Sequence, residues 1–383
     1  MASVLLVCHS YPPVIGGSEI EAQRVCAGLL RRGHKVQVIC SGGGAMPKLR
    51  SWTDPMGVPV RQYGDGTRGR SGAYVYAAGV LAWLWKHRRQ YDLVYFLMPG
   101  IQIAAGVPLS AALHKPVLMK FSGSNEVNKL THSFLGRLQL AVLRRWAGRI
   151  LLLNPGMFEE AAAAGLPSAK LSWMPNPVDM KEFEPASREL QQSRRRELGL
   201  DPGALIVVFV GRLAPEKELP SLLDAFAKAR RQVPEAQLVL VGEGPERARL
   251  AQLARTLDIP PEKIRFVGQV IPQAVRNWLQ AADVFALVSR LEGFPVSLLE
   301  AMATGLPSVV SSIPANLQLI RDGENGLAAS VANADELSFA LERLLGDSAL
   351  RARLRAAARA SIQDRYSTEA VVERYEELFS ELG

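Results

Sequence analysis

The chain has 383 residues, of which 48% are hydrophobic and 21% charged. This length is sufficient for two domains of roughly 150–200 residues, and the composition predicts ordinary globular cores rather than a disordered chain. No apolar run in the sequence reaches the ~18 residues of a membrane-spanning helix, and the N-terminus predicts a first strand rather than a signal peptide.

The net charge of +8 is unevenly distributed along the chain. Residues 1–180 contain 20 Lys and Arg against 9 Asp and Glu, whereas the remainder contains 25 against 28. This asymmetry predicts an anionic partner for the first half. Nucleic acid, an anionic membrane and a phosphate-bearing substrate all fit it. Three cysteines in apolar segments (Cys8, Cys26 and Cys40) favour reduced core thiols in a cytoplasmic protein.

The first segments predict a strand–loop–helix–strand unit. A strand over Val4–Cys8 leads into a loop with Gly16 and Gly17, followed by a helix over Glu19–Arg32 and a strand over Lys35–Cys40. Glycines at the start of a helix let the backbone approach a phosphate at its positive end. A glycine pair alone is equally typical of a simple turn.

Two further strands are predicted before the middle of the chain, over Leu93–Leu97 and Val117–Phe121. The second runs into a polar segment that contains Lys120, Ser122 and Asn125.

Two predicted helices, Ala73–Arg89 and Ser133–Arg149, combine aromatic and basic residues. Taken singly, each fits a packed helix with a solvated basic edge slightly better than a membrane surface. Together with the charge asymmetry, they support the hypothesis of an anionic cytoplasmic membrane face as a peripheral, reversible docking partner. The residues behind this hypothesis are Trp83, Trp85, Lys86, Arg88, Arg89, Arg144, Arg145 and Trp146.

The second domain is predicted to begin after a charged segment, Lys181–Pro202, with a buried strand over Leu205–Val210. This strand runs into Gly211-Arg212-Leu-Ala-Pro-Glu-Lys217. Two cations five residues apart, in a loop that enters a helix, suit a diphosphate. The alternative is a pair of solvated surface charges. Gly242-Glu-Gly244 after the next strand lacks the third glycine of a dinucleotide fingerprint, so that interpretation is set aside.

Two carboxylates border the next loop. A strand over Val284–Val288 precedes Glu292, and Glu300 lies on a short helix over Val296–Thr304, before a strand over Pro307–Val310. The carboxylates therefore lie at the carboxyl end of a strand, where open α/β sheets bind ligands. The alternative is a solvated loop glutamate plus a glutamate on the helix surface.

The run Glu292-Gly-Phe-Pro-Val-Ser-Leu-Leu-Glu300-Ala-Met resembles the donor site of retaining GT-B glycosyltransferases (glycosyl transferases group 1), whose two glutamates are separated by seven residues. The resemblance covers essentially the whole chain. It implies an α/β GT-B fold, in which two doubly wound parallel-sheet Rossmann-like domains face a central cleft. Residues 1–180 would form the acceptor-side domain and 181–383 the donor domain, with the last helix, about 367–383, crossing back to the first.

The resemblance also implies roles for individual residues. Arg212 and Lys217 would offset charge on the leaving diphosphate, Glu300 would hold the ribose hydroxyls, and Glu292 would contact the transferred sugar. The implied catalytic residues are thus Glu292, Arg212 and Lys217. The implied donor-binding residues are Gly16, Gly17, Gly211, Arg212, Lys217, Gly268, Glu292, Gly293, Phe294, Pro295, Val296, Ser297 and Glu300.

The chain departs from the family pattern at Ser122, where relatives usually carry a histidine. Lys120, Ser122 and Asn125 remain as acceptor-side candidates. No metal site and no cofactor beyond the donor is expected, because the cysteines and histidines form no ligand-spaced cluster.

We therefore expect a retaining, metal-independent transferase that moves a sugar from a nucleotide-sugar to a hydroxyl acceptor, either a sugar or a lipid-linked sugar. Cell-surface polysaccharide, glycolipid or other glycoconjugate biosynthesis is the expected setting. An inactive nucleotide-sugar-binding protein and a same-fold epimerase, hydrolase or phosphorylase remain alternatives. A nucleic-acid partner is disfavoured because the sequence contains no recognisable reading module.

Overall fold

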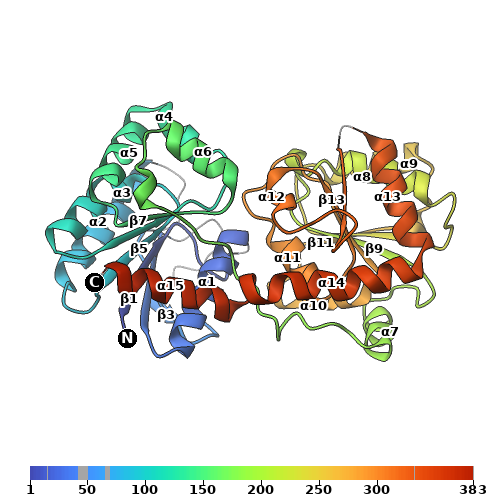
Figure 1. The fold of residues 1–383 in the computed structure, drawn as a ribbon, viewed down its shortest axis with the longest axis horizontal. Helices are drawn as coiled ribbons and strands as arrows, with labels where there is room; N and C mark the ends of the chain where they lie inside the picture. Colours follow the sequence, from blue (N-terminus) through green and yellow to red (C-terminus); the bar gives the residue numbers. More distant parts are fainter. Residues whose placement is uncertain (15, 42–50, 65–69, 332, 383) are drawn as a thin grey trace. The chain divides into compact units, whose positions relative to one another are not determined.

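The computed structural model describes residues 1–14, 16–41, 51–64, 70–331 and 333–382. The chain divides into two compact units, of which the first comprises Met1–Pro177 with Thr368–Gly383 and the second Val178–Ser367. The first unit thus ends slightly before the predicted boundary at residue 180, and the last helix belongs to it. Both units are α/β, with a central sheet and helices on both of its faces (Figure 1).

The first unit contains a sheet with the order β3-β4-β2-β1-β5-β6-β7-β8. All of its pairings are parallel except that of β3 with β4. The strands are β1 (Ser3–Cys8), β2 (Lys35–Cys40), β3 (Ser51–Thr53), β4 (Pro59–Gln62), β5 (Leu93–Leu97), β6 (Val117–Lys120), β7 (Arg149–Leu152) and β8 (Leu171–Trp173).

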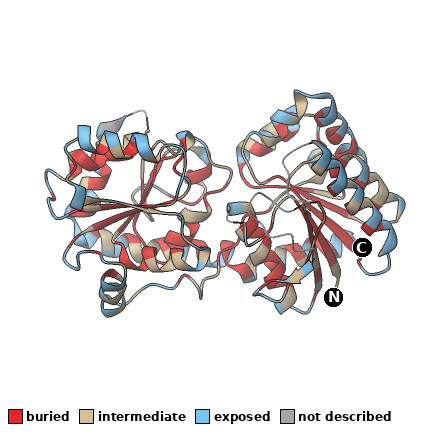
Figure 2. Cartoon of the chain, turned by 180° about the vertical axis from the view of Figure 1, so that it is seen from behind, coloured by how far each residue is buried: buried red, intermediate tan, exposed pale blue. Residues whose placement is uncertain are grey.

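The helices of the first unit cover a sheet whose central strands are buried on both faces, as Figure 2 shows in red. On one face, alternate residues of β1 pack with Val372, Tyr375 and other apolar residues of the last helix, α15. The Tyr375 hydroxyl lies 2.9 Å from that of Tyr95. The helices are α1 (Gly17–Arg31), α2 (Arg70–Lys86), α3 (Ile101–Ala112), α4 (Glu126–Thr131), α5 (Phe134–Trp146), α6 (Pro155–Ala163) and α15 (Thr368–Leu382).

The three cysteines are buried in this unit and form no disulfide with one another, as predicted. Burial raises the pKa of the Cys26 thiol, which therefore stays protonated at neutral pH.

Two predicted helices have different bounds in the structure. The helix predicted over 73–89 is α2, which ends at Lys86. The helix predicted over 133–149 is α5, which is shorter at both ends because Ser133 caps it and Arg149 already begins β7. The Ser133 hydroxyl accepts a hydrogen bond from the Gly136 N–H, as N-cap residues do.

The second unit contains a fully parallel sheet with the order β11-β10-β9-β12-β13-β14. Its central strands are runs of apolar, often β-branched residues, which is typical of parallel strands covered on both faces. The strands are β9 (Ile206–Val210), β10 (Gln237–Val241), β11 (Ile264–Gly268), β12 (Val284–Leu287), β13 (Ser308–Ser311) and β14 (Leu327–Ala329).

Two groups of helices cover this second sheet (Figure 1). Helix α8 packs against α9 and α13, whereas α10 packs against α7 and α11 against α14. The helices are α7 (Arg188–Glu197), α8 (Leu219–Ala229), α9 (Arg247–Thr256), α10 (Pro272–Ala281), α11 (Val296–Ala303), α12 (Pro314–Leu317), α13 (Ala334–Gly346) and α14 (Ser348–Tyr366).

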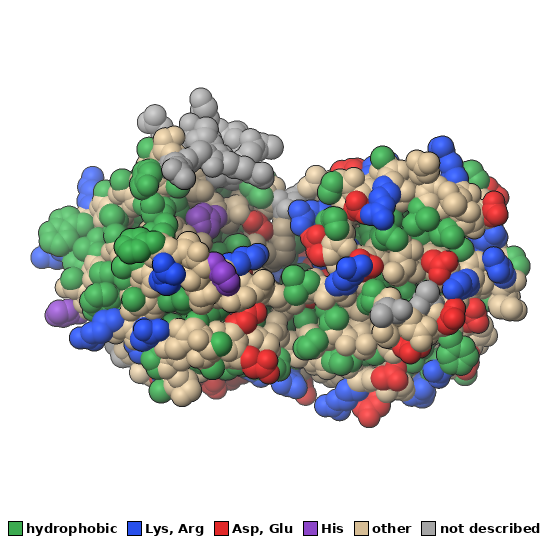
Figure 3. All heavy atoms as spheres, turned by 90° about the horizontal axis from the view of Figure 1, so that it is seen from above, with side chains coloured by type: hydrophobic (Ala, Val, Ile, Leu, Met, Phe, Trp, Pro, Cys, Tyr) green, Lys and Arg blue, Asp and Glu red, His purple; other side chains and the backbone are tan. Residues whose placement is uncertain are grey.

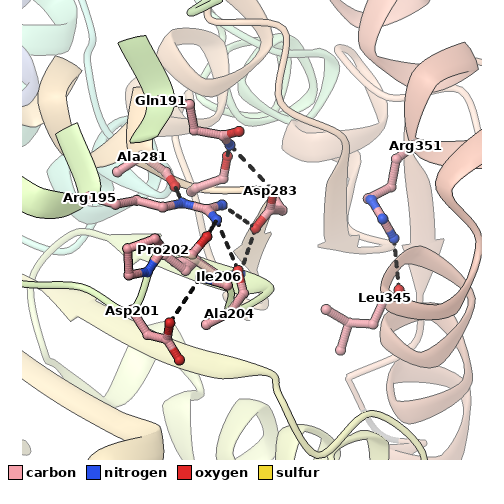
Figure 4. A network of polar contacts seen from close by, with 12 residues as sticks. Gln191, Arg195, Asp201, Pro202, Ala204, Ile206, Ala281, Asp283, Leu345 and Arg351 are labelled. Atoms are coloured by element: carbon pink, nitrogen blue, oxygen red, sulfur yellow. Dashed lines mark hydrogen bonds and ion pairs between the residues drawn. The ribbon is translucent and has the colours of Figure 1, made fainter. Parts of the chain in front are cut away.

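A buried polar network joins the starts of β9 and β12 (Figure 4). The guanidinium of Arg195, on α7, lies 2.6 Å from Asp283 Oδ2 and donates to the carbonyls of Ala281 and Ala204. The same Asp283 oxygen accepts a hydrogen bond of 2.7 Å from the N–H of Ile206, the first residue of β9. This network therefore fixes the positions of the first residues of β9 and β12 relative to one another.

The order of strands reverses at β9 in the second sheet. From β9 the chain continues through β10 and β11 on one side, and then through β12, β13 and β14 on the other. The loops that follow β9 and β12 consequently leave the sheet side by side at the point of reversal. In open α/β sheets this point is where ligands bind.

Candidate functional site

The loop after β9 carries the two predicted cations. A single 3₁₀ turn, Pro215–Lys217, leads into α8, and the residue between them, Glu218, has a left-handed backbone (φ 49°). The Arg212 side chain is 67% exposed and forms an ion pair of 2.5 Å with Glu216. The Lys217 side chain is only 18% exposed and points toward the neighbouring loop.

Two glycines in the loop after β10 allow it to support the β9 loop. A Cβ atom on Gly242 would overlap the carbonyl oxygen of Gly211, and one on Gly244 would overlap that of Leu213. The backbones are joined by hydrogen bonds from the Gly211 N–H to Val241 and from the Leu213 N–H to Glu243, each 3.0 Å. The Gly-x-Gly motif therefore has a structural explanation, which is the close approach of two loops.

The loop after β12 places Glu292 against Lys217. The Lys217 ammonium lies 2.6 Å from Glu292 Oε1, and the hydroxyl of the buried Ser289 donates to the same oxygen at 2.6 Å. Nearby, the Arg290 N–H donates to the carbonyl of Glu216, and the Arg290 guanidinium lies 2.6 Å from Glu218. The structure thus brings two predicted site residues, 75 positions apart, into direct contact.

Helix α11 follows and carries three more of the predicted donor-binding residues, Val296, Ser297 and Glu300, while Gly293, Phe294 and Pro295 directly precede it. Phe294 is buried, with its ring 5.8 Å from that of Tyr366, and Pro295 and Val296 begin the helix. Ser297 and Glu300 are three positions apart and therefore share a helix face. Glu300 is 4% exposed. The positive ends of α8 and α11 both follow these loops, which favours an anion there.

Two further glycines of the predicted donor set lie at strand ends. Gly211 follows β9 directly, whereas Gly268 ends β11, two strands away in the sheet. The Gly268 carbonyl accepts a hydrogen bond from Gly242. Gly268 therefore contacts the supporting β10 loop.

In the first unit, Gly16 precedes α1 and Gly17 begins it. The Glu19 carboxylate lies in the first turn, where it accepts hydrogen bonds from the hydroxyls of Ser10 and Ser18. A Cβ atom on Gly16 would overlap this carboxylate, so the glycine leaves room for it. A phosphate at this helix start would thus compete with Glu19.

Lys120, which was predicted as an acceptor-side contact, is fully buried. Its ammonium forms an ion pair with Glu21 of α1 and donates to Asn176 Oδ1 at 3.0 Å. Burial lowers the pKa of Lys120 and raises that of Glu21, while each charge favours the ionised form of the other. The pair joins α1 to the end of β6 inside the first unit.

Ser122 and Asn125 lie between β6 and α4. The Ser122 N–H donates to Glu126 Oε2 at 3.0 Å, and the buried Ser122 hydroxyl has no hydrogen-bond partner among the described residues. Asn125 has a left-handed backbone (φ 64°), and its N–H donates to Glu160. Burial raises the pKa of the Glu126 carboxyl.

Sequence reasoning assigned no individual role to Ser289, Glu19 or Glu21. Ser289 directly follows a predicted strand, and that position was a usable signal. Nothing local in the sequence marks Glu21, because its partner lies in a distant segment.

Over the part of the chain that is described, no group of three His, Cys, Asp or Glu side chains is arranged to hold a metal ion. Within the same residues, no helix combines the length and the apolar character needed to cross a bilayer.

Comparison with known proteins agrees with this geometry. The family model for "Glycosyl transferases group 1" matches residues 191–361, and that for "Glycosyltransferase Family 4" matches residues 15–182. The HepE protein of Anabaena, solved in complex with UDP-glucose, superimposes with a TM-score of 0.81 at 20% identity, covering 100% of both chains. The fold is that of the GT-B glycosyltransferases.

Two relatives differ in their identity to this chain and in how much of it they cover. A GDP-mannose-dependent monoacylated alpha-(1-6)-phosphatidylinositol monomannoside mannosyltransferase of Corynebacterium glutamicum is 32% identical, over 52% of this chain and 54% of that relative, about half of its length. An uncharacterized glycosyltransferase of Methanocaldococcus jannaschii is 24% identical over 96% of this chain and 95% of that one. Together the two family models match residues 15–182 and 191–361, and with these relatives they support a GT-B glycosyltransferase of the group 1 family.

Proposed function

We propose that this chain transfers a sugar from a nucleotide-sugar to a hydroxyl acceptor, with retention of anomeric configuration and without a metal ion. The observation that carries the proposal is the meeting of Lys217 and Glu292 where the second sheet reverses its strand order. A cation and a carboxylate side by side suit a substrate with a diphosphate next to a sugar. The UDP-glucose complex of HepE and the GDP-mannose-dependent relative support this donor class.

In the proposed reaction, the bond between the sugar C1 and the diphosphate oxygen breaks, and a bond from the acceptor oxygen to C1 forms on the same face. The hydroxyl proton passes to the departing diphosphate. Lys217 and Arg212 would stabilise the negative charge that develops on the diphosphate, which is a charge role that needs no metal. Glu292 would hold hydroxyls of the transferred sugar.

A donor screen tests this function. UDP-, GDP-, ADP- and dTDP-sugars would be assayed for nucleotide release with a panel of sugar and lipid-linked acceptors, with and without EDTA. We expect acceptor-dependent release with one donor class, unchanged by EDTA, and NMR should show the donor's anomeric configuration in the product. Inversion would contradict the retaining assignment, loss of activity with EDTA would contradict metal independence, and an epimerised or phosphorolysed product would contradict transfer.

Glu300 is expected to act in nucleotide binding rather than in the chemical step. Ribose hydroxyls are bound equally in the ground and transition states, so loss of their partner should appear as lost affinity. Because hydrogen bonds to a charged group are strong, Glu300→Ala should weaken binding of the nucleoside diphosphate roughly tenfold or more, as measured by calorimetry. Glu300 is buried, so a thermal melt serves as the folding control. Unchanged affinity in a folded variant would contradict this role.

The hypothesis of a membrane-docking face concerns helices α2 and α5, which both pack on α3. Large apolar side chains on them are exposed, up to 78% for Phe134, and basic residues lie beside them. In Figure 3, hydrophobic and basic side chains occur together on the viewed face of the first unit. The exposed apolar residues are Tyr74, Val75, Trp85, Phe134, Leu135, Leu138 and Trp146.

The structure corrects one member of the predicted set, Trp83, and shows hydrogen bonds of another, Arg144. Trp83 is buried, with its ring 4.5 Å from that of His87, so it cannot reach a membrane. The Arg144 guanidinium donates to the carbonyls of Gly165 and Ala164, so it is already used at the end of α6. Trp85 remains exposed, with Arg88 5.0 Å from its ring centre.

We propose that this face binds an anionic membrane surface and that the acceptor is lipid-linked, as in the phosphatidylinositol-linked acceptor named for the Corynebacterium relative. Each cation near such a surface contributes about 1 kcal/mol. The double variant Arg137→Glu/Arg145→Glu should therefore lower binding to anionic vesicles by more than tenfold in co-sedimentation.

Arg196→Glu/Arg231→Glu, which reverses two exposed charges in the second unit, is the matched control and should bind as the wild type does. Added salt should weaken wild-type binding. Equal losses in the two double variants, or no wild-type binding at low salt, would remove the membrane hypothesis without affecting the donor assignment.

A further inference from the structure

The Lys217 ammonium is held by a carboxylate of the same site. The distance of 2.6 Å to Glu292 Oε1 is that of a charge-assisted hydrogen bond, and the two side chains are only 18% and 10% exposed. An ion pair this sheltered from water is stronger than one on the surface. Any anion that binds Lys217 must compete with this pair.

A chain of buried hydrogen bonds holds Glu292 in place. Ser289 donates to Glu292 Oε1, and the Ser289 carbonyl accepts a hydrogen bond of 2.5 Å from the Ser311 hydroxyl. The Asn316 amide in turn donates to Ser311 Oγ at 2.9 Å. These residues follow β12, end β13 and lie on α12, so the rigid end of the sheet fixes the position of the Glu292 loop.

We propose that Glu292 is the internal counter-ion of Lys217 and that the diphosphate of the donor replaces it in a partner exchange. This inference rests on the proposed function of the site. In the exchange, Lys217 moves from the carboxylate to a phosphate oxygen, and Glu292 keeps its hydrogen bond from Ser289. The carboxylate oxygen that Lys217 leaves, Glu292 Oε1, can then accept a hydrogen bond from a hydroxyl of the donor sugar.

The exchange couples the two halves of the donor. A diphosphate alone breaks the ion pair and supplies nothing to replace the hydrogen bond that Glu292 accepted from Lys217. A nucleotide-sugar supplies both a phosphate anion for Lys217 and sugar hydroxyls that donate hydrogen bonds to Glu292. The site therefore favours a complete donor over the free nucleotide, which is also the leaving product. Displacement of a pre-formed ion pair thus works as a specificity device.

The test is calorimetry with whichever of UDP, GDP and ADP binds the wild type. In Glu292→Gln the amide is neutral and no longer competes for Lys217, so the nucleoside diphosphate should bind about three- to tenfold more tightly. Turnover should nevertheless fall, and the preference for the nucleotide-sugar over the nucleotide should shrink. Glu218→Gln is the matched control, since it removes one nearby carboxylate that pairs with the exposed Arg290 instead.

The double variant Lys217→Ala/Glu292→Gln separates partner exchange from electrostatic repulsion between the Glu292 carboxylate and the diphosphate. Without Lys217, the glutamine substitution should change the affinity no more than Glu218→Gln does in the wild type. Unchanged or weaker binding by Glu292→Gln, while Lys217→Ala still weakens binding, would overturn the exchange alone. Unchanged binding by Lys217→Ala would overturn the donor site itself.

Discussion

Lys217→Ala is expected to lower kcat on the order of 10²-fold with the cognate donor, because it removes a fixed cation from the place where the leaving diphosphate gains charge. Lys217 is the more sheltered of the two cations, and the β12 loop holds its side chain in place. Arg212→Ala should act in the same direction. The Arg212 guanidinium must leave the surface carboxylate of Glu216 to reach a phosphate, and such an exposed pair resists little.

Arg290 provides the matched control for this prediction. It lies in the loop that carries Glu292 and is 71% exposed, paired with Glu218. Arg290→Ala removes the same charge from the neighbouring β12 loop, outside the predicted diphosphate contact, so near wild-type turnover is expected. Steady-state kinetics of the three variants with one donor are decisive. Wild-type rates for both Lys217→Ala and Arg212→Ala would show that the donor is bound elsewhere.

Elements with a strong local pattern were predictable from the sequence. The bounds of β2 and β5 agree with the predicted segments Lys35–Cys40 and Leu93–Leu97, and α15, Thr368–Leu382, agrees with the last helix predicted at about 367–383. In each of the strands, apolar or β-branched residues lie between turn residues, and in α15 the apolar residues recur with helical spacing. The two parallel sheets that the resemblance implied are present, apart from the antiparallel pairing of β3 with β4.

Short or untypical elements were not predicted. The three-residue strands β3 and β14 are too short to show a period, and α3 contains Pro108 in its interior. In α2, aromatic residues lie on two opposite faces of the helix, and the sequence did not show which face, that of Trp83 or that of Trp85, is buried. Only packing against neighbouring elements decides which of the two faces solvent.

In the candidate site, too, contacts between residues far apart in the chain were not predictable from the sequence. Arg212, Lys217 and Glu292 were named because each belongs to a compact local motif after a strand. The contact between Lys217 and Glu292 spans 75 residues and depends on the strand order, which a single sequence does not reveal. For the same reason Lys120 was predicted as a ligand contact, although α1 supplies a buried partner for it.

That buried pair leads to the largest stability effect expected for a single substitution. Lys120→Met shortens the unbranched side chain by only one atom but leaves the Glu21 carboxylate, 1% exposed, without its cation. Removing one partner of a buried ion pair typically costs about 3–5 kcal/mol of unfolding free energy. The expected result is a large downward shift of the urea midpoint. Lys228→Met, which breaks an exposed ion pair with Asp335, is the control and should shift it little.

The pH dependence and a second substitution test the cause of this loss. Burial already raises the pKa of the Glu21 carboxyl above its ordinary value of 4.5, and Lys120 opposes that shift. Without Lys120 the pKa should rise further, so the folded state binds a proton that the unfolded state has lost, and stability falls as pH rises above about 4.5. The deficit of Lys120→Met should therefore be larger at pH 8 than at pH 5. Adding Glu21→Leu should recover most of the stability and remove this pH dependence, because no buried charge is left. A deficit that is independent of pH and persists in the double variant would instead assign the loss to packing around Lys120.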